Sequence, residues 1–385
     1  MSSDLHTGFD EQEYPHINKG LDGIVAFSTT KSFIDGKVGD LIYSGYHIDT
    51  LAENATFEEV CFLLWNDRLP NSSELNHLKK ELIDHRELPE TVLTYIKSTS
   101  KDAEPMAVLR TAVSMLADSD STFGKYDESL FMDQAISITA RIPSIIAAFD
   151  RSRKGKDIIS PLKEGSTAFN FLYMLNGEKP GEQAEKTMDL CLILHAEHGM
   201  NASTFTARTI TATMSDMYSS VTGAIGALKG PLHGGANEAV MKMINEIKTL
   251  ENTQSYILDK LKKKDRIMGF GHRVYKTIDP RAVILSNISK QLQSDQGGIL
   301  YDISTEIENI MKREKNLRPN VDFYAASVYT MLNIPSHLFT PIFAVSRISG
   351  WCAQILEQYV DNRLIRPRAN YVGPKSRTYI PLKDR

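Results

Sequence analysis

Apolar side chains recur at helical spacing along most of this 385-residue chain. In Phe57–Leu64 they occupy positions i, i+3, i+4 and i+7, and Thr56 and Glu59 form a capping box at the start of this run. That period places one apolar face of a helix against a core. Similar stripes occur at Met188–His195, Val240–Ile247 and Ile303–Met311. The pattern predicts a mainly α-helical, multi-helix fold.

Glycine and proline mark the exceptions to this helical pattern. Thr29–Tyr46 carries Asp35 and Gly36 between short β-branched or aromatic runs, which predicts a small N-terminal β-hairpin. Pro143 lies inside the apolar run Ile136–Phe149 and predicts a kink or an end of a helix there. Connections between helices are predicted at Lys154–Lys156 and Asn176–Gly181.

Two predicted helix starts place arginines. Asp279 and Thr340 each precede a proline, so each is a capping side chain before a residue suited to the first helical position. Arg281 then falls in a first turn, and Arg347 lies roughly two turns into its helix. The sequence alone does not bring these two arginines together.

The charge balance limits the classes of partner. A net charge of -4 and a pI near 6.2 give no global attraction to nucleic acid or to an anionic membrane. An anionic ligand would therefore have to be bound by local arginines. We expect neither a nucleic-acid partner nor a membrane partner.

Cysteine usage and the first residues indicate the compartment. Cys61, Cys191 and Cys352 are far apart and each lies in an apolar helical pattern, which predicts buried thiols in a reducing compartment. The start of the chain, Met1–His6, is polar, and no run of about 18 apolar residues follows. These features predict a cytoplasmic enzyme.

Three segments combine titratable side chains with glycine or a helix start. They are Gly226–Asn237 around His233, Gly269–Tyr275 around His272, and Pro319–Phe323 around Asp322. Histidine titrates nearest neutrality, and glycine lets backbone approach a ligand closely, so the set is typical of an acid–base site. A histidine in an isolated Gly-His-Gly fragment is more often a turn residue, and Asp322 could instead cap a helix.

In their order and spacing these segments resemble the short, dimeric bacterial and archaeal form of citrate synthase. The resemblance extends from Gly39–Tyr46 to Ile365–Tyr371. It implies a helical homodimer with a large domain, residues 1–222 and 331–385, that forms the dimer interface. Residues 223–330 would form a small domain on the CoA side of a cleft, and its closure would exclude water.

The family's reaction condenses acetyl-CoA with oxaloacetate and water to give citrate and CoA, through an enol and citryl-CoA. The resemblance implies that Asp322 takes the methyl proton as general base. His233 would donate a hydrogen bond to the thioester oxygen, and His272 would polarise or protonate the ketone. It implies neither a metal nor a permanently bound cofactor, with acetyl-CoA and CoA as co-substrate and product.

Oxaloacetate carries two carboxylates, for which the guanidinium fork of arginine is well shaped. The residues that match the family's oxaloacetate contacts are His198, Arg281, Arg347 and Arg366. Arg366 would reach into the neighbouring subunit's site, although a lone arginine near a C-terminus is more often a surface charge. Relatives generally have glutamate after the histidine that matches His198, whereas this chain has Gly199.

The predicted CoA contacts lie around the second histidine segment. They are Arg266, Ile267, Met268, Gly269, Phe270 and Lys276. The first five match the family's backbone recess for adenine. The basic run Lys260–Arg266 that leads into them would meet the phosphates of CoA, although such a run is usually a solvated face.

Two polar residues near His198 have other predicted roles. His195 lies in an apolar stripe and is predicted to be a core histidine, whereas Asn201 either contacts substrate or ends a helix.

Two other functions stay open. Glu197 before His198 is a feature that resembles the 2-methylcitrate synthases, which use propionyl-CoA. One methylene in a pocket discriminates between the two acyl donors by only about 1 to 3 kcal/mol. A catalytically silent helical scaffold is the remaining alternative, and the intact His233, His272 and Asp322 argue against it.

Overall fold

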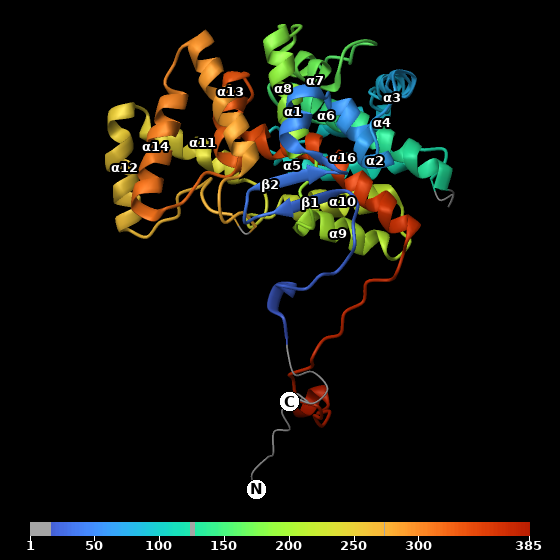
Figure 1. The fold of residues 1–385 in the computed structure, drawn as a ribbon. Helices are drawn as coiled ribbons and strands as arrows, with labels where there is room; N and C mark the ends of the chain where they lie inside the picture. Colours follow the sequence, from blue (N-terminus) through green and yellow to red (C-terminus); the bar gives the residue numbers. More distant parts are fainter. Residues whose placement is uncertain (1–16, 124–127, 273) are drawn as a thin grey trace. The chain divides into compact units, whose positions relative to one another are not determined.

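The computed structural model describes residues 17–123, 128–272 and 274–385. The polar start at Met1–His6 and Arg273 lie outside these residues. The described part is mainly α-helical, as predicted, and Figure 1 shows the helices with a small sheet at their centre. The first helices are α1 (Ile48–Asn54), α2 (Phe57–Asn66), α3 (Ser72–Asp84), α4 (Glu90–Ser98), α5 (Pro105–Leu116), α6 (Glu128–Arg153), α7 (Thr167–Asn176) and α8 (Glu182–His195). The others are α9 (Ala202–Thr211), α10 (Met217–Leu228), α11 (Ala236–Ile247), α12 (Leu250–Lys262), α13 (Pro280–Gln296), α14 (Leu300–Lys315), α15 (Val321–Met331) and α16 (Phe339–Val360).

The described residues form two compact units. Thr29–Arg363 is one unit, and it contains all of these α-helices and the sheet. The other unit joins the chain up to Ser28 with Leu364–Arg385, so it contains Arg366. The expected division into a large domain and a small domain at residues 223 and 330 stays a prediction.

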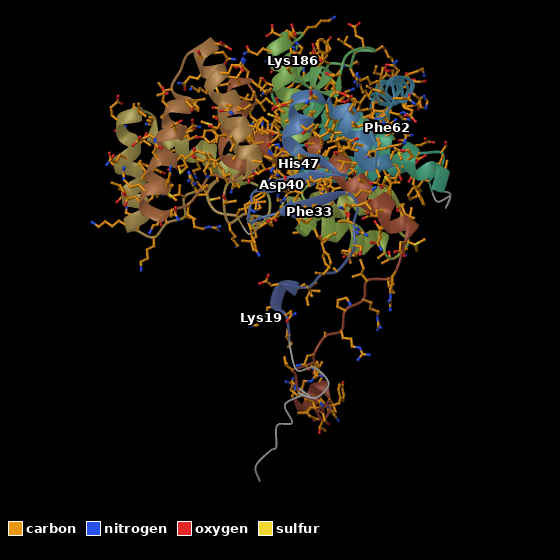
Figure 2. The ribbon with its side chains drawn as sticks, in the orientation of Figure 1. Lys19, Phe33, Asp40, His47, Phe62 and Lys186 are labelled. Atoms are coloured by element: carbon orange, nitrogen blue, oxygen red, sulfur yellow. The ribbon has the colours of Figure 1, made fainter. Side chains whose placement is uncertain are left out.

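The predicted hairpin is present near the start of the larger unit. Strands β1 (Ser32–Asp35) and β2 (Asp40–Tyr43) pair antiparallel, and the short β3 (Tyr46–His47) pairs with β2. A four-residue turn joins β1 to β2, and Asp35 Oδ1 accepts the backbone N–H of Lys37 at 2.8 Å. Figure 2 draws the side chains of both strands as sticks and labels Phe33 on β1 and Asp40 on β2.

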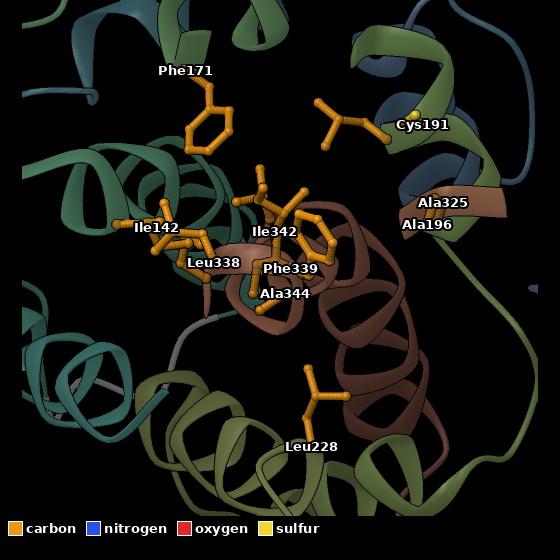
Figure 3. Close-up of a cluster of buried hydrophobic side chains, with 14 of the residues drawn as sticks. Ile142, Phe171, Cys191, Ala196, Leu228, Ala325, Leu338, Phe339, Ile342 and Ala344 are labelled. Carbon is orange, nitrogen blue, oxygen red and sulfur yellow. The ribbon is translucent and has the colours of Figure 1, made fainter. Parts of the chain in front are cut away.

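Helix α16 lies at the centre of the core. Apart from Phe343, every residue from Phe339 to Ile355 is buried, as expected of a helix that is apolar on all sides. It packs against α2, α6, α8, α9 and α10. Figure 3 shows Phe339 and Ile342 of α16 beside Ile142 of α6.

Several local predictions are confirmed. The apolar stripes of α2, α8, α11 and α14 face the core, and Thr56 forms the capping box with Glu59. Asp279 caps α13, with Pro280 as its first residue. The predicted connections are present: residues 154–156 follow the end of α6, and the segment 176–181 leads from the last residue of α7 to α8. The buried, free thiols are Cys61, Cys191 and Cys352.

Two helix boundaries differ from those expected. Helix α6 continues through Pro143 to Arg153, so Pro143 does not end a helix, and a kink there stays a prediction; buried side chains on both sides hold the helix against the core despite the missing backbone donor. Helix α16 begins at Phe339 without a side-chain cap, so Thr340 lies inside it. The Thr340 hydroxyl instead donates to Glu238 Oε1 on α11 at 2.6 Å.

Within residues 17–123, 128–272 and 274–385, no helix is both long and apolar enough to cross a bilayer.

Candidate active site

One cavity of about 440 Å³ collects the predicted residues of the larger unit. The predicted residues that line it are His198, His233, His272, Arg281, Asp322 and Arg347. They come from positions that span about 150 residues of sequence, yet they share this one space. Arg366 belongs to the other unit, and its contact with the site stays a prediction.

His272 lies on the loop between α12 and α13, and backbone groups fix its tautomer. Its Nδ1 accepts the backbone N–H groups of Val274 at 3.0 Å and Tyr275 at 3.2 Å. An Nδ1 that accepts leaves the imidazole proton on Nε2. Burial, and then the nearby Arg281, lower the pKa of His272 to about 4, so the ring is neutral at pH 7.

His233 lies in the turn between α10 and α11, and Ser203 at the start of α9 holds it. The His233 Nε2 is 2.8 Å from Ser203 Oγ and 3.3 Å from the backbone N–H of the same residue. In the tautomer with its proton on Nδ1, Nε2 accepts from Ser203. Trp351 Nε1 donates to Ser203 Oγ at 3.1 Å and fixes this hydroxyl from the α16 side. Burial, and then Arg347, lower the pKa of His233 to about 4.

His198 lies in the turn after α8 and meets the His272 loop. Its Nε2 is 3.2 Å from the Tyr275 hydroxyl, and the centroids of the His198 and His272 rings are 5.3 Å apart. Burial holds the pKa of His198 well below its usual value, and Arg281 and Arg347 add to this effect. Three neutral histidines therefore face the two arginines.

His198 has Gly199 after it and the carboxyl group of Glu197 before it. Gly199 adopts a left-handed backbone with φ of 59°, and its N–H donates to Ser32 Oγ at 3.0 Å. The Glu197 side chain is fully buried, and its Oε1 accepts from Ser32 Oγ at 3.1 Å and Gln354 Nε2 at 3.2 Å. Burial raises the pKa of Glu197, although Arg347 opposes the rise. A buried carboxyl group thus precedes His198 in this chain.

Asp322 lies in the first turn of α15. The cap of that helix is Asn320, whose Oδ1 accepts the Asp322 backbone N–H at 3.1 Å, so the alternative that Asp322 caps the helix is wrong. Its carboxyl group lines the cavity instead. Burial raises the pKa of Asp322 to about 6, while Arg281 and Arg347 oppose the rise. A carboxylate with this pKa is ionised at pH 7 and still basic enough to take a proton.

Both buried arginines are held by fixed acceptors. Arg281 donates from Nε and Nη2 to the two carboxylate oxygens of Asp279, at 3.0 and 2.9 Å. Asp279 also accepts the backbone N–H of Val321, which ties α13 to the start of α15. Arg347 Nε donates to the carbonyl oxygen of His195 at 2.7 Å. The His195 side chain itself is fully buried, which confirms that it is a core histidine.

The sequence did not identify all the supporting residues. Asp279 was predicted only as a helix cap, and nothing in the local pattern singled out Ser203, Tyr275 or Trp351. Asn201 begins α9 rather than ending a helix, because its Oδ1 accepts the N–H of Thr204 at 3.1 Å. It also lines the cavity, which is consistent with its other interpretation as a substrate contact.

The predicted CoA segment packs against the start of α15. Gly269 has φ of 80°, and a Cβ atom there would lie 2.8 Å from side chains of Phe323 and Val240, so only glycine fits. The Phe270 ring lies 4.7 Å from that of Phe323. Arg266 and Lys276 are exposed.

The geometry defines a class of enzyme. A cavity with neutral histidine donors, one carboxylate of raised pKa and two buried arginines can bind a dianion and move a proton beside it.

Comparison with known proteins shows the family. Residues 20–368 match the family model described as citrate synthase, C-terminal domain. Citrate synthase 2 of Bacillus subtilis (strain 168) is 52% identical, covering 95% of this chain and 99% of that protein. A 2-methylcitrate synthase of Shewanella oneidensis is 42% identical, covering 95% and 97%. The chain belongs to the citrate synthase family, whose members are acyltransferases.

A solved structure agrees with this result. The ternary complex of carboxymethyl coenzyme A and oxaloacetate with citrate synthase from Thermoplasma acidophilum is similar, with a TM-score of 0.91 and 35% identity. The match covers 96% of this chain and all of that one (100%). The predicted multi-helix citrate-synthase-like fold is confirmed.

Proposed function

We propose that this chain condenses acetyl-CoA with oxaloacetate and water to give citrate and CoA. The observation that carries this proposal is the single cavity shared by His233, His272 and Asp322 with Arg281 and Arg347. Each group has the protonation state that the reaction requires near pH 7. The relatives named citrate synthase support the same activity.

Carbon–carbon bond formation begins with removal of a methyl proton. The Asp322 carboxylate takes that proton, and the electron pair of the C–H bond moves toward the thioester oxygen to give an enolate. His233 donates a hydrogen bond from Nδ1 to the thioester oxygen as negative charge develops there. A neutral donor suits this step because the oxygen gains charge only in the transition state.

The enolate carbon then attacks the ketone carbon of oxaloacetate. The ketone oxygen becomes an alkoxide and takes a proton from His272 Nε2–H, the position that its backbone contacts leave protonated. The product is citryl-CoA. Water then returns a proton to His272 as its oxygen attacks the thioester carbonyl, the C–S bond breaks, and the thiolate takes the proton held by Asp322, so CoA leaves as the thiol.

Arginines and His198 hold oxaloacetate in this scheme. Arg281 and Arg347 bind its carboxylates, and their fixed contacts to Asp279 and to the His195 carbonyl keep them in place for that contact. His198 contacts the substrate from the facing turn. Both guanidinium groups are buried, which strengthens their pairing with an anion.

Arg366 completes the site from the neighbouring subunit of a homodimer. The test is a mixture of two inactive variants, Asp322→Asn and Arg366→Ala, dissociated and reassembled together. Every mixed dimer would then hold one site with neither defect, so about a quarter of all sites should regain activity. Absence of any recovery would refute the shared site.

CoA binds beside the His272 loop. A second cavity of about 280 Å³ shares Gly271 and His272 with the first and is also lined by Lys276 and Arg318, which would meet the phosphates. The backbone of Arg266–Phe270 would receive the adenine. Lys260 and Lys263 pair with Asp265 and Asp259, so much of the preceding basic run is already neutralised. Charge reversal at Lys276 should raise KM for the thioester and leave KM for oxaloacetate unchanged.

Substrate binding closes residues 223–330 onto the rest of the chain. Closure would exclude water during enolisation, when a free enolate would otherwise be protonated. Small-angle scattering with and without oxaloacetate tests this expectation. An unchanged radius of gyration would contradict it.

Propionyl-CoA is the alternative acyl donor, and the similar Shewanella oneidensis protein favours it as a second candidate. The decisive experiment follows thiol release from acetyl-CoA and propionyl-CoA in parallel, with oxaloacetate present, and compares kcat/KM. A higher value for acetyl-CoA supports the citrate synthase activity. A higher value for propionyl-CoA identifies a 2-methylcitrate synthase. If neither thioester releases a thiol, the catalytically silent scaffold is favoured.

A further inference from the structure

The turn of the β1–β2 hairpin packs directly on the loop that carries His272. The backbone N–H of Lys276 donates to the Gly36 carbonyl oxygen at 2.7 Å. A Cβ atom at Gly36 would overlap the carbonyl oxygen of Val274, and one at Gly39 would lie 2.6 Å from that of Ile278. Backbone therefore meets backbone along this contact, and no flexible side chain separates the two segments.

The other end of β1 holds the turn that carries His198. Ser32 Oγ accepts the N–H of Gly199 at 3.0 Å and donates to Glu197 Oε1 at 3.1 Å, so it binds the residues on both sides of this histidine. A Cβ at Gly199 would lie 3.3 Å from the Ile34 side chain, which itself lines the cavity.

The two segments held by the hairpin meet inside the cavity. The His198 and His272 rings are 5.3 Å apart, and His198 Nε2 is 3.2 Å from the Tyr275 hydroxyl. We infer that the β1–β2 hairpin is a positioning element that fixes the spacing between the His198 turn and the His272 loop. The inference rests on the proposed function, in which both histidines face oxaloacetate.

The hairpin can fix this spacing because it connects the two segments through only a few residues of chain. Ser32 and Gly36 are four residues apart on rigid, hydrogen-bonded backbone, whereas His198 and His272 are joined in sequence only through several helices. A displacement of about 1 Å between reacting groups can lower the rate about 100-fold. The hairpin reaches both segments without contributing an acid or base of its own.

Gly36→Ala tests the contact with the His272 loop. Gly36 lies outside the left-handed region, so alanine fits its backbone and the perturbation comes from the overlap with Val274. The control in the same turn is Val38→Ala, whose side chain is 70% exposed. Gly181→Ala is the control for the glycine change, since an added Cβ there meets nothing within 4 Å.

For Gly36→Ala we expect kcat to fall about 10- to 100-fold and KM for oxaloacetate to rise. KM for acetyl-CoA should rise as well, because the displaced loop also carries Lys276. Ser32→Ala, a milder variant, should also raise KM for oxaloacetate. Both controls should match the unmodified protein. Kinetic constants of Gly36→Ala equal to those of Val38→Ala would overturn the inference.

Crystal structures of Gly36→Ala and Val38→Ala give a result that does not depend on activity. The separation of the His198 and His272 rings should change in the first variant and stay at its original value in the second. An unmoved His272 loop in Gly36→Ala would overturn the inference. An unmodified protein that releases no thiol would instead refute the proposed function, and the ring separation would still decide the role of the hairpin.

Discussion

Replacing Asp322 by asparagine should sharply lower turnover and at the same time stabilise the fold. Burial raises the pKa of this carboxyl to about 6, even though Arg281 and Arg347 favour its charged form. The folded protein therefore holds the ionised carboxylate at a cost in free energy. Asparagine has nearly the same shape and carries no charge, so it avoids that cost.

The magnitude follows from the difference between the folded and unfolded pKa values. A rise from 3.8 to about 6 corresponds to about 3 kcal/mol. Because the folded state binds the proton more tightly, the stability of the unmodified protein decreases as pH rises from about 4 to 6, and the full cost applies above that range. Asp322→Asn should therefore gain about 2 to 3 kcal/mol at pH 8 and roughly half as much at pH 5.

Urea unfolding at pH 8 and pH 5 measures this gain. Asp302→Asn, which changes an exposed carboxylate in the first turn of α14, is the matched control and should show no such pH-dependent gain. Turnover of Asp322→Asn should fall by about 10²- to 10⁴-fold, as expected for loss of a general base. An equal gain at both pH values would refute the argument from burial, and retained turnover would refute the role as base.

Three further predictions concern the same cavity. The acid limb of kcat/KM should lie near pH 6, where Asp322 becomes protonated, since the pKa of His272 is already lowered to about 4; a limb near pH 4 would contradict this assignment. Ser203→Ala removes the hydroxyl partner of the His233 Nε2, so kcat should fall about 10-fold with KM for oxaloacetate unchanged. An unaffected kcat in steady-state kinetics would contradict this role of Ser203. Asp279→Asn leaves Arg281 buried without its carboxylate, so the free energy of unfolding should fall by about 3 kcal/mol and KM for oxaloacetate should rise; a variant of normal stability in urea would count against this pairing.

Local patterns predicted the elements of the fold well wherever local and tertiary preferences agree. The apolar stripe and capping box of α2 follow from residues within one or two turns of each other, and so does the cap of α13 at Asp279. The turn of the hairpin at Gly36 was recognisable for the same reason. An incorrect prediction arose where tertiary contacts outweigh local preference, at Thr340, which lies inside α16 and donates to Glu238 on α11 instead of capping its own helix.

The sequence by itself determined which residues can do the chemistry. The sequence is enough to recognise His233, His272 and Asp322, because each lies in a short segment with glycine or a helix start, and these features depend on only a few residues. Only the tertiary structure decided how these groups are held and charged. Ser203 meets His233 across 30 residues and Ser32 meets Glu197 across 165, and no local pattern encodes such pairs. The shifted pKa values likewise come from burial, which depends on how distant helices pack together.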